Sequence, residues 1–310
     1  MDIAVLSDIH GNYEAFHTCV EYALRRNITN FWFFGDYVGE FGFPQRTMNL
    51  LYELNERYTC KYIRGNKEDY WLNYEASGRT LWSRYDSTTG SLYYTYHNLT
   101  DRDLLFFKSM KIMEEIDLTE KEKAVICHGS PASNRGKLLP DDEKTYEIMD
   151  SLNADIIFCG HTHIQREFVH NGKKVINPGA VGVPLQSMGK AQFVLLHEMK
   201  NVHEMKNVHE MKNVHEMKNV HETEGGYKEE FISLEYDIER ELENFRLSGL
   251  IEYAPYWYKV TKQLLKTGNV SHGVVLSKAM ELCREEEGEC IWPHVPERYW
   301  EKAYKSIFED

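Results

Sequence analysis

The sequence predicts an α/β fold, because short apolar segments with strand character alternate with segments of helical periodicity. Apolar runs at 3–6, 31–34, 124–126 and 156–158 each end in a short polar motif, and residues near 12–27 and 45–57 have the spacing of helices. At 310 residues and 42% hydrophobic content, the chain can form one large domain or one domain with an appendage. Ligands bind such folds where the carboxyl ends of adjacent strands converge.

Five polar motifs follow predicted strands in a fixed order. Four come directly after the apolar runs, and the remaining one follows a weaker strand at 61–64. Side chains at these strand ends are expected to share one crevice. Their carboxylate and imidazole groups favour divalent manganese, iron or zinc over magnesium or calcium. The motifs are Asp8-Ile9-His10, Gly35-Asp36, Gly65-Asn66, Cys127-His128-Gly129 and Gly160-His161-Thr162-His163.

The order of these motifs resembles that of the calcineurin-like metallophosphoesterases, which read D-x-H, G-D, G-N-H-[DE], H and G-H-x-H. The resemblance covers roughly residues 1–240, and the segments 8–12 and 176–180 are most similar to the small bacterial and archaeal phosphodiesterase branch. It implies a four-layer α/β/β/α sandwich of two mixed sheets flanked by helices. A helical C-terminal extension at 241–310 lies beyond the segment that can be matched.

The same resemblance implies two divalent metal ions per chain, of manganese, iron, zinc or nickel. It assigns Asp8, His10 and His163 to one ion, Asn66, His128 and His161 to the other, and Asp36 to the bridge between them. Two such ions activate a bridging hydroxide and polarise the phosphoryl oxygens. The expected catalytic residues are Asp36, Asn66, Lys67 and His128. A purely structural role for all seven ligands is disfavoured, because their burial would be costly.

Lys67 is the position where the chain departs from the family pattern, which has histidine after Gly-Asn. A lysine can clamp a phosphate oxygen but is a poor tunable acid, because its reference pKa is about 10.4. A solvated lysine on a loop is an equally weighted alternative. Asn12 is a second candidate for substrate binding, with capping of the following helix as its alternative role.

The remaining sequence contains two expected insertions. An aromatic-rich, mainly helical insertion spans about 69–110, where Thr100 is expected to cap a helix. Its aromatic residues are expected to pack in a core, with stacking on a nucleobase as the alternative. Strands at 191–196 and 230–236 are expected to form a hairpin that carries a hexamer repeat at 197–222, to which no catalytic role is assigned.

Composition restricts the partners. A formal net charge of −13 disfavours binding along a nucleic-acid backbone. The sequence shows neither the pattern of a secretory signal nor an apolar stretch long enough to span a membrane. The six cysteines include no C-x-x-C pair, so we expect them to be reduced thiols. We therefore expect a cytoplasmic protein without membrane contact. The expected partner is a small phosphoester, and homo-oligomerisation is a further alternative.

The predicted activity is hydrolysis of a phosphoester, and a diester is favoured over a monoester because position 67 lacks the usual histidine acid. Nucleotide-like compounds or other small phosphodiesters with good leaving groups fit this chemistry. One alternative is a phosphomonoesterase or protein phosphatase of the same superfamily. Another is a non-catalytic scaffold, because the phosphoesterase-like subunit of the retromer coat resembles this branch too.

Overall fold

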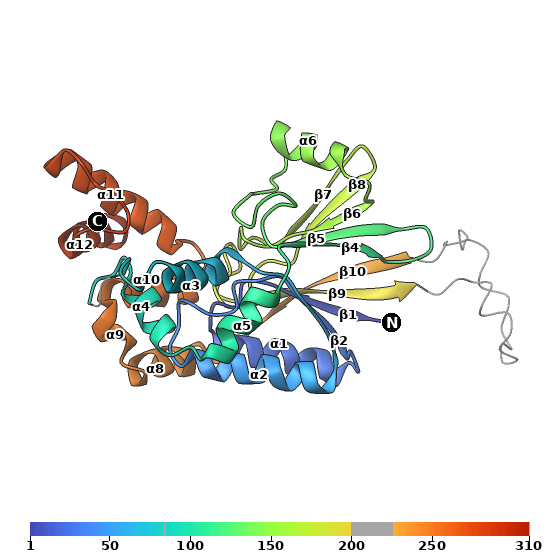
Figure 1. Ribbon diagram of the computed structural model, residues 1–310, viewed down its shortest axis with the longest axis horizontal. Coiled ribbons are helices and arrows are strands. Elements are labelled where there is room, and N and C mark those ends of the chain that lie inside the picture. The colour runs from blue at the N-terminus through green and yellow to red at the C-terminus, as the bar shows by residue number, and fades with distance from the viewer. Residues whose placement is uncertain (83–84, 200–225, 310) are drawn as a thin grey trace, which may run out of the picture.

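The computed structural model describes residues 1–82, 85–199 and 226–309, and these form two mixed five-stranded sheets packed face to face (Figure 1). In the first sheet the strand order is β10-β9-β1-β2-β3, and in the second it is β4-β5-β6-β8-β7. Strands β1, β2 and β3 are parallel, as are β5, β6 and β8, while β9 and β10 and the strands β4 and β7 run antiparallel to their neighbours. The strands are β1 Ile3–Leu6, β2 Asn30–Phe33, β3 Thr59–Tyr62, β4 Met113–Asp117, β5 Lys123–Cys127, β6 Ile156–Phe158, β7 Arg166–His170, β8 Lys173–Asn177, β9 Ala191–Met199 and β10 Gly226–Leu234.

Helices cover the outer face of each sheet, which confirms the predicted four-layer sandwich. Figure 1 shows α1 and α2 along the first sheet and α6 over the second. The C-terminal helices gather with α3 and α4 at one end of the strands. The helices are α1 Tyr13–Arg25, α2 Pro44–Arg57, α3 Asn66–Ala76, α4 Gly90–His97, α5 Asp101–Ser109, α6 Glu143–Ser151, α8 Ile238–Leu247, α9 Leu250–Tyr253, α10 Pro255–Thr267, α11 His272–Glu287 and α12 Glu297–Phe308.

The alternation of side chains along β1 explains the layers. Successive side chains of a strand point to opposite faces of its sheet. Ile3 and Val5 belong to the apolar cluster between the two sheets, together with Phe158 of β6. Ala4 and Leu6 belong to a different cluster, which contains the apolar faces of α1 and α2. Because both faces of β1 are covered, its side chains are apolar without interruption.

Several local predictions are confirmed. Strands β9 and β10 form the expected antiparallel hairpin, with Val194 opposite Phe231. The Thr100 side chain accepts a hydrogen bond from the Asp103 N–H at the start of α5. The aromatic insertion is mainly helical, and most of its rings are buried, as in the stack of Tyr74 on Trp82 at 4.0 Å between ring centroids. The hexamer repeat beyond Met199 lies outside the described residues.

The C-terminal helices pack on the sandwich through an apolar cluster of their own. Trp257, Leu264 and Trp300 are buried in it, and Phe41 and Tyr94 from the first part of the chain join it. The division of the chain at residue 240 stays a prediction, since α8 crosses that position. No helix among the described residues is long and apolar enough to cross a membrane.

A buried carboxyl group links α8 to the start of α1, close behind the first polar motif. The Glu14 N–H donates to Oε2 of Glu241 at 3.1 Å, and Oε1 of Glu241 is buried without a hydrogen-bond partner among the described residues. Burial, and then the nearby Glu14 carboxylate, raise the pKa of Glu241 to about 8. The folded protein therefore keeps a proton here that an unfolded chain, with an ordinary value of 4.5, has lost.

The first prediction concerns the pH dependence of stability. Because the folded-state pKa of Glu241 is raised, its contribution to stability is complete below about pH 4.5 and is lost as the pH rises towards about 8. Glu241→Gln cannot ionise, so it should match the wild type near pH 4.5 and be more stable than the wild type at pH 8.5, by on the order of 4 kcal/mol. Urea unfolding at both pH values measures this difference. Parallel pH profiles for the two proteins would show that Glu241 ionises normally.

Candidate metal centre

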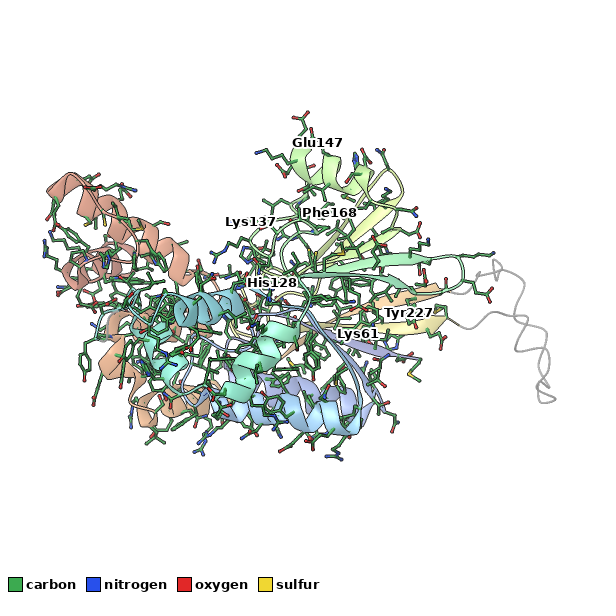
Figure 2. The ribbon with its side chains drawn as sticks, viewed as in Figure 1. Lys61, His128, Lys137, Glu147, Phe168 and Tyr227 are labelled. Carbon is green, nitrogen blue, oxygen red and sulfur yellow. The ribbon has the colours of Figure 1, made fainter. Side chains whose placement is uncertain are left out.

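The five polar motifs lie where strand ends of both sheets meet. Asp8 and Asp36 follow β1 and β2 of the first sheet, while His128 and His161 follow β5 and β6 of the second. Figure 2 shows His128 near the middle of the molecule, at the strand ends that face the C-terminal helices. The remaining motif residue, Asn66, begins α3. Sequence reasoning therefore placed the motifs at the correct strand ends.

Two glycines allow the motif loops to approach each other closely. A Cβ atom on Gly160 would lie 2.0 Å from the Ser7 Oγ, and one on Gly35 would lie 2.4 Å from the backbone nitrogen of Gly65. A hydrogen bond also joins the loops of the two sheets: the His161 N–H donates to Asp8 Oδ2 at 3.0 Å. Larger residues at these glycines would separate the strand ends that form the site.

Five of the seven predicted ligands have left-handed backbone conformations. The φ angles of Asp8, His10, Asp36, His161 and His163 lie between 55° and 66°. Such conformations cost non-glycine residues on the order of 1 kcal/mol or more each, and they persist only where the surroundings enforce them. All five residues lie within five positions of the end of β1, β2 or β6. Backbone strain is thus concentrated at the predicted ligands.

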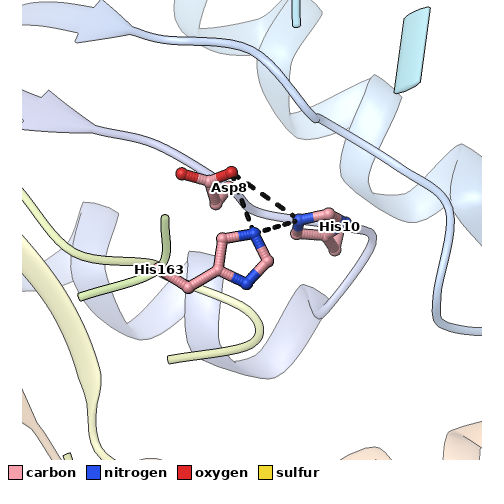
Figure 3. Close-up of side chains that lie close together, drawn as sticks. All are labelled: Asp8, His10 and His163. Carbon is pink, nitrogen blue, oxygen red and sulfur yellow. Dashed lines mark hydrogen bonds and ion pairs between the residues drawn. The ribbon is translucent and has the colours of Figure 1, made fainter. Parts of the chain in front are cut away.

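One group of ligand atoms consists of Asp8, His10 and His163 (Figure 3). The Nε2 atoms of the two histidines lie 3.2 Å apart. Two imidazole nitrogens attract each other only weakly unless a proton or a cation lies between them. Asp8 Oδ1 lies 3.2 Å from His163 Nε2 and 3.7 Å from His10 Nε2. These three residues are the set that the family resemblance assigned to one ion.

A second group consists of Asp8, Asp36 and His128. His128 Nε2 lies 3.5 Å from Asp36 Oδ1 and 4.0 Å from Asp8 Oδ1. Asn66 Oδ1 joins this group at 3.1 Å from His128 Nε2. The ring of His161 stands edge-on to that of His128, with 5.2 Å between centroids. All four side chains expected at the second ion and the bridge are therefore adjacent.

Two carboxylates connect the groups. Asp36 directs Oδ1 towards His128 and Oδ2 towards His10, whose Nε2 lies 3.7 Å away. Asp8 belongs to both groups through one oxygen, Oδ1. The bridging role of Asp36 stays a prediction, and the geometry makes Asp8 a second candidate that the sequence reasoning did not name.

The donor set fits divalent cations. Asp8 Oδ1 is buried and has no hydrogen-bond partner among the described residues, although both candidate groups surround it. The Asp8, Asp36, Glu40 and Glu68 carboxyl groups are all buried here, and Lys67 is the one lysine or arginine that pairs with any of them among the described residues. Uncompensated buried negative charge is costly, and bound cations would remove that cost.

The pKa values in the metal-free protein reflect the same excess of carboxylates. Burial would lower the pKa of His10, but Glu40 and Asp8 raise it to about 10. His128 is buried too, yet Asp36 and Asp8 raise its pKa. Burial lowers the pKa of His161 to about 4, with the neighbouring His128 adding to the effect. Metal ions must displace protons from His10 and His128, so metal binding should strengthen as the pH rises.

Glu40 was not identified from the sequence and orients His10 from behind. Its Oε2 contacts His10 Nδ1, which leaves Nε2 of the ring facing Asp8 and His163. A carboxylate on the far nitrogen fixes the tautomer and orientation of a metal-binding histidine. No motif signalled this role, because Glu40 lies thirty residues after His10 in a loop of irregular structure.

Lys67 lies in the first turn of α3 with about 12% of its side chain exposed, so a solvated loop lysine is the wrong description. Its Nζ lies 2.5 Å from Glu40 Oε1, and its backbone N–H donates to Asp36 Oδ1 at 2.8 Å. Burial alone would lower the pKa of Lys67, but the Glu40 and Asp36 carboxylates hold it above its ordinary value. Lys67 is therefore a fixed cation that neutralises Glu40, while contact with a phosphate remains a prediction.

Two other residues have structural roles. Glu68 accepts hydrogen bonds from the backbone N–H groups of Asp36, Tyr37 and Gly65, which ties two motif loops together. Asn12 is fully buried and accepts from the Ala15 N–H, and its amide donates to the Gly182 carbonyl and the Tyr236 hydroxyl. The hydrogen bond from the Ala15 N–H is the helix-capping alternative, the two donated hydrogen bonds tie Asn12 to distant parts of the chain, and a substrate contact remains a prediction.

The second prediction tests the connection from Lys67 through Glu40 to His10. Glu40→Gln keeps the shape of the side chain but removes the charge that orients His10, so the affinity for Mn²⁺ should fall about 10- to 100-fold. Lys67→Ala should also weaken Mn²⁺ binding, and the double variant should lose less than the sum of the two single losses, because both act through one contact. Calorimetric titration with Mn²⁺ measures all four proteins.

Additive losses of affinity would separate Lys67 from Glu40. Unchanged Mn²⁺ affinity in Glu40→Gln would contradict an orienting role. Arg79→Ala serves as the control, because it removes only an exposed ion pair with Glu75 near the end of α3. This variant should bind Mn²⁺ with wild-type affinity.

Comparison with known proteins agrees with this geometry. Residues 1–201 match the family model described as the calcineurin-like phosphoesterase superfamily domain. A curated relative, an uncharacterised protein of Methanocaldococcus jannaschii, is 26% identical over 269 residues, covering 81% of this chain and 94% of the relative. The family match includes every predicted ligand.

Two solved structures share the fold over most of their length. A hypothetical protein of Pyrococcus horikoshii has a TM-score of 0.65 at 19% identity, covering 87% of this chain and 99% of that chain. A metallophosphoesterase from Sphaerobacter thermophilus has a TM-score of 0.61 at 20% identity, covering 86% and 99%. Residues 1–240 alone are too few for this coverage, so the likeness extends into the C-terminal helices. The family match over most of the chain, on a site of this composition, shows that the chain belongs to the calcineurin-like phosphoesterase superfamily.

Proposed function

We propose that the protein is a dinuclear metal-dependent phosphodiesterase that acts on a nucleotide-like or other small phosphodiester. The observation that carries the proposal is the pair of ligand groups that share the Asp8 carboxylate. Asp8, His10 and His163 would hold one ion, and Asn66, His128 and His161 the other, with Asp36 between them. Two divalent ions bound there would supply a nucleophile from water at neutral pH and polarise the phosphoryl oxygens.

The protein's own groups would position the reactants. Asp36 and Asp8 connect the two halves of the site, so the ester phosphate would be held between the halves in one orientation. His163 is the most exposed of the candidate ligands in these groups, with about 20% of its side chain accessible. The phosphate would therefore approach from the His163 side, while Glu40 and Glu68 keep His10 and the Asp36 loop in place from the buried side.

The proton supply favours diesters with good leaving groups. A leaving alkoxide needs an acid whose pKa lies near the working pH. Lys67 stays a cation because its pKa is raised, and His161 is a poor proton carrier because burial lowers its pKa to about 4. Activated esters need no such acid. The absence of a histidine at position 67 thus supports the diester over an alkyl monoester.

The third prediction measures this preference. The Mn²⁺-loaded protein should hydrolyse bis(4-nitrophenyl) phosphate with a higher kcat/KM than an alkyl phosphomonoester. Asp36→Asn should lower kcat/KM at least about 100-fold, equivalent to about 2.7 kcal/mol of transition-state stabilisation. Asparagine accepts the left-handed backbone of position 36, so the change isolates the charge. Steady-state kinetics at fixed Mn²⁺ give both values.

Asp142→Asn is the matched control, because Asp142 caps α6 away from the site and asparagine caps helices equally well. It should retain wild-type turnover. A protein that binds Mn²⁺ but hydrolyses neither ester would support the scaffold alternative. Faster hydrolysis of the monoester would support a phosphomonoesterase.

A further inference from the structure

Aromatic and cationic side chains gather beside the Asn66 end of the metal centre. Tyr70 follows Asn66 by four residues in α3, so the two side chains lie on the same face of the helix. The ring of Tyr70 lies 5.7 Å from the Lys67 Nζ, and it is only partly buried, unlike the neighbouring Trp71 and Tyr74. Tyr70 packs against the core and is the aromatic residue of this helix that stays partly exposed.

Arg135 covers Tyr70 from the loop that follows His128. Its Nη1 donates to the Tyr70 hydroxyl at 3.1 Å, and its guanidinium lies 4.6 Å from the centre of the ring. Asn134 fixes this loop to the start of α3, because its amide donates to the Gly65 carbonyl at 3.0 Å. Arg135 is exposed and forms no salt bridge with the described residues.

Trp292 reaches the same place from the C-terminal helices. It lies between α11 and α12, and its ring is 6.0 Å from that of Tyr70, with an angle of 31° between the planes. About 38% of Trp292 is exposed, whereas Trp257 and Trp300 of the same helical region are buried. An exposed tryptophan beside a partly exposed tyrosine and an unpaired arginine offers flat surfaces and N–H donors to a ligand.

We propose that Tyr70, Arg135 and Trp292 form a subsite for the aromatic base of a nucleotide-like substrate whose phosphate lies at the metal centre. This inference rests on the proposed function and adds the substrate class. The route from subsite to metal centre is short, since Tyr70 approaches Lys67 and the Lys67 backbone donates to Asp36. Stacking of a base on an aromatic side chain is worth about 1–3 kcal/mol and tolerates any base, because every base has a flat face.

The subsite also gives the C-terminal helices a role in binding. Trp292 lies between two of these helices. A second contact comes from Trp257 of α10, whose ring centre lies 5.9 Å from the Lys67 Nζ, so α10 packs next to the metal centre. Selectivity for the organic part of the ester would then depend partly on Trp292, which lies outside the segment 1–201 that matches the superfamily.

The test uses adenosine 5′-monophosphate and ribose 5-phosphate, which share the phosphate and the sugar and differ in the base. Calorimetric titration of the full-length, Mn²⁺-loaded protein measures the Kd of each. The wild type should bind the nucleotide at least about tenfold more tightly. Trp292→Ala and Arg135→Ala should each remove most of that preference by weakening nucleotide binding about 5- to 20-fold while ribose 5-phosphate binds as before. Ile291→Ala, at an exposed neighbour of Trp292, should change neither Kd.

Equal affinities for the two ligands in the wild type would overturn the subsite, and so would variants that lose both ligands to the same extent. Arg135→Ala removes an exposed side chain, so it gives a result even if Trp292→Ala fails to fold. The proposed function is judged separately by diester turnover. A protein that prefers the nucleotide but hydrolyses no diester would support the subsite and contradict the proposed phosphodiesterase activity. A protein that hydrolyses the diester but does not prefer the nucleotide would support the activity and contradict the subsite.

Discussion

The structure depends on the burial of several carboxylates within one space between the two sheets. Asp8, Asp36, Glu40 and Glu68 are each less than 5% exposed, and Lys67 alone among the described lysines and arginines pairs with one of them. Such a concentration of negative charge is unfavourable in a low-dielectric interior unless cations or protons balance it. The neighbouring Asp8, Asp36 and Glu40 carboxylates raise the pKa values of His10 and His128, which favours protonated rings there when no cation is bound. Two divalent ions would balance the same charge without protons.

The sandwich is built so that this charge can be assembled. Parallel strands in each sheet bring their carboxyl ends to one side, and Gly160 lets the second sheet approach Ser7 of the first. Left-handed turns at Asp8, His10, Asp36, His161 and His163 direct the ligands inward. The left-handed conformations at these positions lower the stability of the fold, and the packed apolar layers around them keep the backbone in these conformations. Fold and site are therefore consequences of the same strand ends.

Much of this could be predicted from the sequence, because strand-end motifs are local. Apolar runs that end in Asp8, Asp36, His128 and His161 identify the strands and the strand ends where the candidate ligands lie, and Thr100 identifies a helix start. Groups that act through the tertiary fold gave no such signal. Glu40 lies in an irregular loop, Trp292 comes from helices without a recognisable motif, and the environment of Lys67 depends on where Glu40 folds. The position of Lys67 within a helix could have been inferred, since Glu68 and Asp69 are acidic residues of a first turn.

The central claim is that two ions occupy the space around Asp8 and Asp36. The most direct measurement is an anomalous difference map from crystals of the protein grown with Mn²⁺. We expect two peaks per chain, each at about 2.0–2.3 Å from its ligand atoms, one beside His10 and His163 and the other beside Asn66 and His128, with a shared aspartate between them. A single peak, or peaks away from both ligand groups, would contradict it.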